Sequence, residues 1–363
     1  MGYVLPGWLD EILDYMGIKV PNATMTYPRI TAELLAQEEL PGLESRSRNH
    51  LDTFLVRDRA CWLVSEREGS VVVGRVASDP DRVLAERRSW PVPRPGQNQG
   101  FVSPLPDAGL ATVDRGLVTV YGQDGSPRWT YEFQPWPDED TAGGACVPVG
   151  TAGRLLVTTT GSIGDDGLLG ADVCVCLDLA DGRPVAEAEL PSATAGYVFQ
   201  QSLTDPAQIF LDALMGDTCF SLELSLEDDA VHVRPVGDDD EPFAGVSLRG
   251  AVLKLDVGGQ WLTRCVTGQE DTFVEAEDVL PQGLRFVGHR PGLLDEGRVL
   301  AAAAAEQGSD ANRHLILDGH TLQPVAEVDY PGTTCYDPLA LGDGTWLTTE
   351  EDVVRRWRVT GAE

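Results

Sequence analysis

The segment from Val173 to Glu187 decides the fold, and it reads VCVCLDLADGRPVAE. A short apolar run, a turn built on Asp181-Gly182 and a second short run are typical of a β-hairpin. The segments His314–Glu327, HLILDGHTLQPVAE, and Leu117–Tyr131, LVTVYGQDGSPRWTY, have the same order of features. One structural unit is therefore predicted to recur along the chain.

Looser copies of the unit surround three further turns. Together, the turns are centred on residues 80, 124, 181, 228, 269 and 319. A repeat of roughly 40–50 residues is the length of one four-stranded blade in a β-propeller. Six blades are thereby accounted for.

A seventh repeat begins near Tyr336, with strands expected at Thr345–Thr349 and Val353–Val359, but the chain ends at residue 363, one strand short. Segment 24–36 precedes the first repeat and has no blade of its own, so we expect it to supply the missing strand. Ring closure removes strand edges that would otherwise pair with other chains. The sequence thus predicts an all-β, seven-bladed β-propeller whose last blade is closed by an N-terminal strand.

Two regions are expected. Residues 1–22 form an N-terminal arm, and residues 23–363 form the propeller. The blades are expected at about residues 50–93, 98–136, 145–192, 196–237, 242–280, 284–331 and 334–359, the last completed by residues 24–36.

The repeated unit resembles the PQQ-like and WD40-like propeller repeats, in which an xLDxxTGxxxW pattern recurs. Leu177–Val185 (LDLADGRPV) and Val120–Trp129 (VYGQDGSPRW) carry the likeness. The resemblance implies a propeller shape but does not imply a cofactor, and we expect none. Nearly all positive charge is arginine, with Lys19 and Lys254 as the lysines, and this bias indicates a GC-rich, actinobacterial source.

The charge of the chain restricts its partners. Lys+Arg 27 against Asp+Glu 58 gives a net charge of -31. Such a field repels phosphate backbones and anionic membranes, so we expect neither nucleic acid nor membrane as a partner. The sequence shows no signal-peptide pattern and no run of about 18 apolar residues, so a cytoplasmic location is expected.

Local catalytic and metal-binding signatures are missing from the sequence: GxSxG, SxxK, GxxxxGK[ST], HExxH and the calcium-loop spacing. Five histidines (50, 232, 289, 314, 320) are interpreted as structural or exposed, and the acidic runs at 138–140, 164–167 and 238–241 as solvated loops. Cys174, Cys176 and the other five cysteines are interpreted as buried reduced thiols. We therefore expect no metal, and a chain that is not an enzyme. The alternative is a lactonase-like hydrolase, or another small-ligand or metal-binding propeller, with a site assembled from separate blades at the central channel.

Two features suggest contact with a protein partner. In the arm, apolar residues recur at helical spacing with acids between them, which predicts a short amphipathic helix that docks either on a partner or back on the propeller; they are Trp8, Leu9, Ile12 and Met16. Residues 45–100 carry ten basic and seven acidic side chains, and the arginines there either dock an acidic partner or neutralise nearby acids; the candidates are Arg46, Arg48, Arg57, Arg59, Arg87 and Arg88. The sequence therefore favours a protein-interaction scaffold with an unidentified partner.

Overall fold

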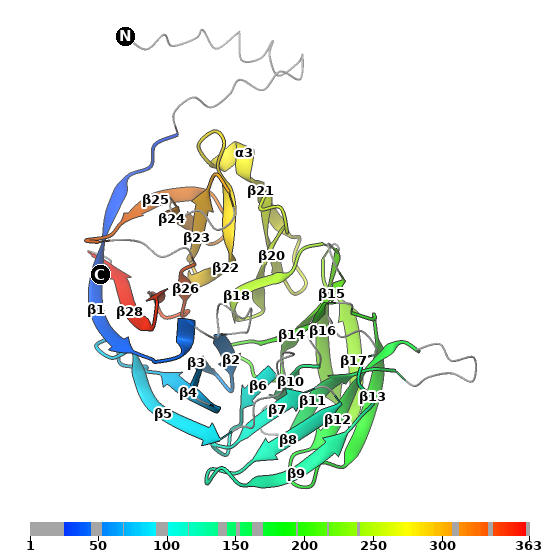
Figure 1. Cartoon of the computed structure of the whole chain (residues 1–363). Coiled ribbons are helices and arrows are strands. Elements are labelled where there is room, and N and C mark those ends of the chain that lie inside the picture. The colour runs from blue at the N-terminus through cyan, green and yellow to red at the C-terminus, as the bar shows by residue number, and fades with distance from the viewer. Residues whose placement is uncertain are drawn as a thin grey trace, which may run out of the picture.

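The chain folds into a ring of β-sheets (Figure 1). The computed structural model describes residues 25–44, 53–67, 69–91, 101–114, 116–136, 144–149, 153–161, 170–193, 195–215, 218–237, 240–306, 312–332 and 337–360. The arm and the helix predicted within residues 1–22 lie outside these residues. The regular elements of the described residues are almost all strands, and α3 (Ala276–Val279) is one turn long. Within the described residues, no helix has the length and apolar composition of a membrane span.

Five sheets have four strands each, hydrogen-bonded in chain order, and we call them blades 1 to 5. Blade 1 contains β2 (Phe54–Arg57), β3 (Ala60–Arg67), β4 (Ser70–Val76) and β5 (Leu84–Pro91). Blade 2 contains β6 (Phe101–Pro104), β7 (Leu110–Asp114), β8 (Leu117–Tyr121) and β9 (Pro127–Glu132). Blade 3 contains β10 (Cys146–Val149), β11 (Arg154–Thr159), β12 (Asp172–Asp178) and β13 (Pro184–Leu190). Blade 4 contains β14 (Gly196–Gln201), β15 (Ile209–Met215), β16 (Thr218–Glu227) and β17 (Ala230–Pro235). Blade 5 contains β18 (Phe243–Leu248), β19 (Ala251–Leu255), β20 (Trp261–Val266) and β21 (Thr272–Glu275).

The remaining strands form one eight-stranded sheet in the order β22-β23-β24-β25-β1-β28-β27-β26. Its strands are β22 (Arg285–Asp295), β23 (Arg298–Ala304), β24 (Arg313–Asp318), β25 (Pro324–Asp329), β26 (Leu339–Ala340), β27 (Thr345–Glu350), β28 (Val353–Val359) and β1 (Arg29–Glu39).

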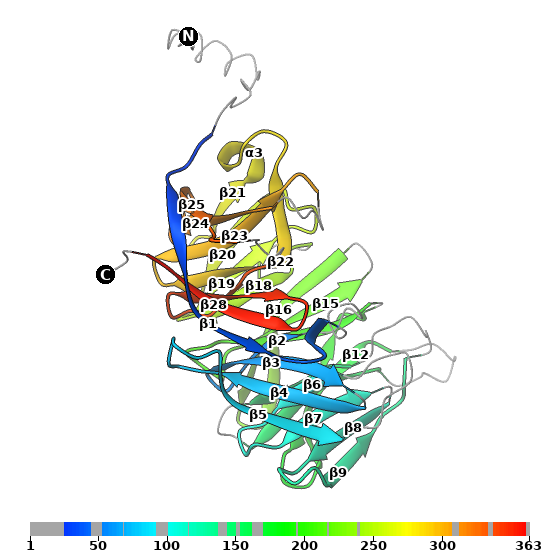
Figure 2. The same ribbon diagram turned by 60° about the vertical axis from the view of Figure 1, so that its left-hand side comes forward.

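Strand β1 joins the two halves of this sheet. It pairs antiparallel with β28, from Ala32 opposite Val359 to Glu39 opposite Val353, so the predicted N-terminal strand does pair with the C-terminal strand. At Arg29–Thr31 it also pairs parallel with β25. Figure 2 shows β1 crossing from β25 to β28. Because β1 bonds on both sides, the strands that we assigned to the last two blades form one curved sheet, and five separate blades are observed in place of seven.

The repeated turn links neighbouring blades through tryptophan. The indole Nε1 of Trp129 in β9 donates to the Leu179 carbonyl in the turn of blade 3, at 2.9 Å. A Cβ on Gly182 would lie 2.6 Å from the Trp129 ring, and Gly182 has a φ of +76°, so glycine fits this turn on both grounds. Trp90 in β5 donates similarly to the Gly122 carbonyl of blade 2, at 3.1 Å. The last strands of blades 3 and 4, β13 and β17, contain no tryptophan.

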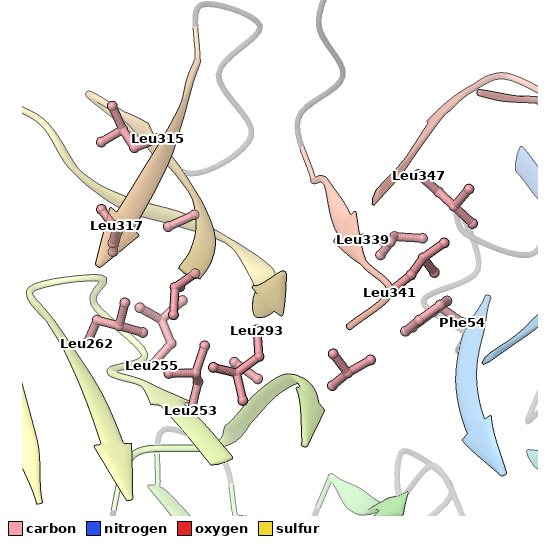
Figure 3. Close-up of a cluster of buried hydrophobic side chains, with 14 of the residues drawn as sticks. Phe54, Leu253, Leu255, Leu262, Leu293, Leu315, Leu317, Leu339, Leu341 and Leu347 are labelled. Carbon is pink, nitrogen blue, oxygen red and sulfur yellow. The ribbon is translucent and has the colours of Figure 1, made fainter. Parts of the chain in front are cut away.

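The apolar core is continuous around part of the ring. One large cluster joins blade 5, the eight-stranded sheet and blade 1, and Figure 3 shows Leu253, Leu293, Leu339 and Phe54 within it. Between blades 4 and 5 the buried apolar cluster is small, and it consists of Phe210, Phe243, Val252 and Cys265 with Val236 packed against it. The seam between blades 4 and 5 thus depends more on polar contacts than its neighbours do.

Six cysteines fall within the described residues, and all six are buried and free, which confirms their interpretation as buried thiols. Cys335 lies outside the described residues.

Candidate functional site

Arg57, one of the predicted docking arginines, is buried. It ends β2 and is only 3% exposed. Its Nε donates to Ser103 Oγ at 2.9 Å and its Nη1 to the Val56 carbonyl at 2.8 Å, while Nη2 reaches the Phe199 carbonyl of blade 4 at 3.3 Å. Its assignment to an exposed docking surface was wrong, because the guanidinium holds the inner strands of blades 1, 2 and 4 together.

Gln201 of blade 4 adds further hydrogen bonds between the inner ends of the blades. The Gln201 amide donates to the Pro148 carbonyl of blade 3 at 2.9 Å and accepts the Asp58 backbone N–H at 2.8 Å. The inner ends of blades 1, 3 and 4 are therefore bonded to one another. Among the described residues, no group of three or more His, Cys, Asp or Glu side chains is placed to hold a metal.

The other docking candidates within the described residues are Arg59, Arg87 and Arg88, and they do not form one surface. Arg59 is exposed in the turn after β2. Arg87 and Arg88 are adjacent on β5 and so point to opposite faces of the sheet. Arg87 donates to the Glu39 carbonyl at 3.4 Å, and Arg88 pairs with Glu86 at 3.0 Å. Arg46, Arg48, Trp8, Leu9, Ile12 and Met16 lie outside the described residues, so the role of these candidates in binding stays a prediction.

Blade 5 carries an exposed aromatic pair that sequence reasoning did not single out. Phe273 is 62% exposed and Trp261 is 36% exposed. Register places Phe273 opposite Thr263, and Trp261 opposite Glu275. Because side chains two apart on a strand share a face, Trp261, Thr263 and Phe273 lie together, and Asp271 and Glu275 flank Phe273. We call Trp261, Phe273, Asp271 and Glu275 the aromatic–acidic face.

A buried lysine lies in the same row of side chains. Lys254 is paired with Thr263 across β19 and β20 and is fully buried. Its Nζ donates to the Val236 carbonyl at 3.0 Å and lies 3.8 Å from Glu241 Oε2. The Glu241 carboxylate also accepts the Trp261 indole N–H and the Thr263 hydroxyl, the latter at 3.3 Å. The buried carboxylate of Glu241 therefore orients the Trp261 ring.

The opposite side of the seam contributes a buried aspartate from β15. Asp212 Oδ2 accepts the Phe243 backbone N–H at 3.0 Å, and its Oδ1 lies 2.7 Å from Ser221 Oγ. Burial raises the pKa of Asp212 to about 7, although the hydrogen bonds from Ser221 and Phe243 and the charge of Lys254 act to lower it. A carboxyl with this pKa changes its charge near neutrality.

Blade 4 faces the seam with polar side chains. On β16 and β17, Leu222, Leu224 and Val231 pack toward blade 3, where β17 lies against β13. The alternate positions face blade 5, and there Arg234 pairs with Glu223 while His232 is exposed. In Figure 1, β20 and β21 belong to the upper group of strands and β17 to the lower group. One side of the seam is thus polar and the other aromatic and acidic.

A sequence signal for this face existed. Residues 255–284 contain six acidic residues, one arginine, and Trp261 and Phe273 at alternating strand positions. That combination indicates an acidic surface with aromatic anchors. The sequence alone did not show that these residues are exposed, because it does not show which face of blade 5 packs on the core.

Comparison with known proteins shows the fold and nothing more specific. No family model and no curated protein matches the chain. BamB from Moraxella catarrhalis is 12% identical, with 92% of this chain and 99% of that chain covered and a TM-score of 0.47. A streptogramin B lyase is 12% identical over 91% of this chain and 97% of that chain, with a TM-score of 0.49. A prolyl endopeptidase is 13% identical over 86% of this chain but 47% of that chain, with a TM-score of 0.52. The chain is an all-β propeller, and it spans about half the length of the endopeptidase chain.

The expectation that the chain is not an enzyme is corrected by these findings. Lyases are among the solved structures with similar folds, including a virginiamycin B lyase from Staphylococcus aureus that is 13% identical. Our expectation depended on missing local motifs. A propeller assembles its sites from separate blades, so missing motifs do not exclude catalysis.

Proposed function

We propose that this chain binds a protein partner through the aromatic–acidic face of blade 5. The observation that carries the proposal is the exposure of Phe273 beside Trp261, on a strand whose other side packs into the core. Buried aromatic anchors supply most of the binding energy at protein interfaces. Because Glu241 already fixes the Trp261 indole, little side-chain freedom is lost on binding.

Charge indicates the chemistry of the partner. Exposed acids surround the aromatic pair, both on its own face and in the following helix α3, where Glu277 and Asp278 are exposed. A partner segment with lysine or arginine beside an apolar side chain complements this surface. The chain's own arm fits less well, because Asp10, Glu11 and Asp14 would be repelled.

We also propose that the ring has seven blades, with β22–β25 as the sixth and β26–β28 plus β1 as the seventh. The antiparallel pairing of β1 with β28 supports this division, since it gives the last blade its fourth strand. A cytoplasmic location remains our proposal, and the buried free thiols are consistent with a reducing compartment.

The test combines cross-linking in the native host with a matched control. Phe273→Ser removes the anchor, whereas Val325→Ser changes another exposed apolar residue, 48% exposed on β25. We expect the wild type and V325S to cross-link one partner through blade 5, and F273S to lose it. A peptide covering the cross-linked segment should be basic and should bind F273S at least about tenfold more weakly. Equal binding by F273S, or a cross-linked segment that is acidic, would overturn the proposal.

A further inference from the structure

The hydroxyl of Ser221 lies between two acceptors. Its Oγ is 2.7 Å from Asp212 Oδ1 and 2.8 Å from the Glu241 carbonyl oxygen. A hydroxyl carries one hydrogen, so Ser221 can donate to only one of them at a time. If Asp212 is charged, the two acceptors compete. If Asp212 is protonated, its Oδ1–H donates to Ser221 Oγ, Ser221 donates to Glu241, and all three groups are satisfied.

Because both groups are buried, it matters energetically whether Ser221 donates to Asp212 or to Glu241. Asp212 is 2% and Ser221 4% exposed, so an unmet acceptor there is not compensated by water. Several charged or titratable groups face Asp212 or lie on the adjoining faces: Cys219 and Glu223 on β16, His232 and Arg234 on β17, Asp240 and Glu241 before β18, Lys254 on β19, Asp256 in the following turn, Cys265 on β20, and Asp271 before β21. Burial raises the pKa of Asp212, whereas Lys254 and Cys219, of these groups, favour the charged carboxylate.

Glu241 connects this choice to the surface. Its backbone carbonyl is the second acceptor for Ser221, and its side chain accepts the indole N–H of Trp261. A change in what holds the Glu241 backbone therefore acts directly on the residue that orients Trp261.

We propose that protonation of Asp212 is coupled through Ser221 and Glu241 to the position of Trp261, so that the aromatic–acidic face is better organised for its partner when Asp212 is protonated. The coupling to a partner rests on the function proposed above. The coupling to Trp261 concerns the chain alone.

With Asp212 protonated, the Ser221 hydroxyl is committed to Glu241 and the Trp261 ring is held in one position. Loss of the proton draws the hydroxyl toward the carboxylate and leaves the Glu241 carbonyl without that donor. The Trp261 indole can then adopt a second position, and the population of that position depends on the charge of Asp212.

The experiment follows the indole N–H resonance of Trp261 by ¹H–¹⁵N NMR on the full chain from pH 5 to pH 9, with the resonance assigned by its loss in Trp261→Phe. We expect the resonance to move with a midpoint near pH 7 in the wild type. Asp212→Asn reproduces the protonated arrangement, since its amide nitrogen can donate to Ser221 and its oxygen can accept from Phe243. In D212N the resonance should stay at its low-pH position throughout.

Two further variants keep the proposal open to refutation. Ser221→Ala breaks the link while Asp212 remains, so the movement of Trp261 should be lost. His232→Asn removes the imidazole of β17 as an alternative source, and the movement should persist. A wild-type resonance that does not move, or movement that survives in D212N and S221A, would overturn the proposal. None of these outcomes depends on a partner, so failure here is distinct from failure of the cross-linking test.

Discussion

Two seams of the ring each contain a fully buried cation, and they treat it differently. Where the eight-stranded sheet meets blade 1, Arg356 of β28 donates from Nη1 to the carbonyls of Ala77, Asp79 and Arg82 in the turn between β4 and β5, at 2.6, 3.0 and 3.1 Å. Its Nη2 contacts Asp343 at 2.6 Å. Where blade 4 meets blade 5, Lys254 has a carbonyl partner and carboxyl neighbours.

The same fold therefore contains one seam whose contacts are independent of pH and one whose contacts depend on it. A guanidinium presents five donors in a rigid fork, and at Arg356 three of the acceptors are backbone carbonyls that cannot titrate. At Lys254 the balance includes Asp212, whose charge changes near neutral pH. The first seam should close the ring over a wide pH range, whereas the second should respond to pH.

The largest expected effect comes from removing the fixed cation. Arg356 is fully buried, and Arg356→Leu would remove its hydrogen bonds to the carbonyls of Ala77, Asp79 and Arg82 and its ion pair with Asp343. Hydrogen bonds that involve a charged group contribute about 1.5–3 kcal/mol each, so we expect a loss of at least about 3 kcal/mol. Chemical denaturation at pH 7 measures the loss, with Arg355→Leu as the control, because Arg355 on the same strand has an exposed partner in Glu350. Equal losses in both variants would show that the buried contacts of Arg356 do not hold this seam together.

The next largest effect concerns Asp212. Because its pKa is raised in the folded protein, the native chain keeps a proton that the unfolded chain releases between about pH 4 and pH 7. Stability therefore falls across this window, by up to about 1.4 kcal/mol per pH unit, and Asp212→Asn should remove that slope and be more stable than the wild type at pH 8. Denaturation midpoints at pH 5, 6, 7 and 8 give both curves. A D212N protein that is less stable at pH 8 would contradict the assignment.

Cysteine reactivity compares the seams within one molecule. Burial is the main reason that the pKa values of Cys61, near Arg356, and Cys265, near Lys254, are both raised to about 12. Each thiol should therefore react only when its seam opens. We expect alkylation followed by mass spectrometry to label Cys265 at least about tenfold faster than Cys61 at pH 8, which corresponds to about 1.4 kcal/mol in opening free energy. Faster labelling of Cys61 would reverse the comparison.

The smallest expected effect comes from the tryptophan link between blades 2 and 3, which lies outside both seams. Trp129→Phe removes the N–H that donates to Leu179 and keeps most of the ring over Gly182. The expected cost is about 1 kcal/mol, the net value of one hydrogen bond. Thermal unfolding measures it, and an unchanged Cys265 labelling rate would show that the blade 4–5 seam is independent of this link.

Local pattern predicted much of the fold. The hairpin at Val173–Glu187 is observed as β12 and β13, and the closing strand predicted within residues 24–36 overlaps β1 (Arg29–Glu39), which pairs with β28. Both predictions depended on neighbours in sequence and on the need to close a ring. The union of the last two predicted blades into one sheet was not predicted, because the pairing of β1 with β25 is a long-range contact that leaves no periodic signal.

The candidate site was not predicted, for a physical reason. Asp212, Glu241 and Lys254 come from different strands and a connecting loop, and no fixed spacing links them. Their meeting depends on how blades 4 and 5 pack. The prediction for Arg57 was wrong for the opposite reason. An arginine-rich stretch of sequence suggested an exposed docking residue, but the fold buries the guanidinium.

Strand β1 has a consequence for the order in which the molecule is made. Thr31, near the start of the chain, accepts hydrogen bonds from Thr360, and Glu33 pairs with Arg358, more than three hundred residues later. On the ribosome β1 therefore stays unpaired with β28 until the more than three hundred residues between the two strands have been synthesised. Contacts of such sequence separation form slowly, and an open ring exposes strand edges in the meantime. The interval between synthesis of β1 and arrival of β28 is thus the period in which this protein most needs protection from misassembly.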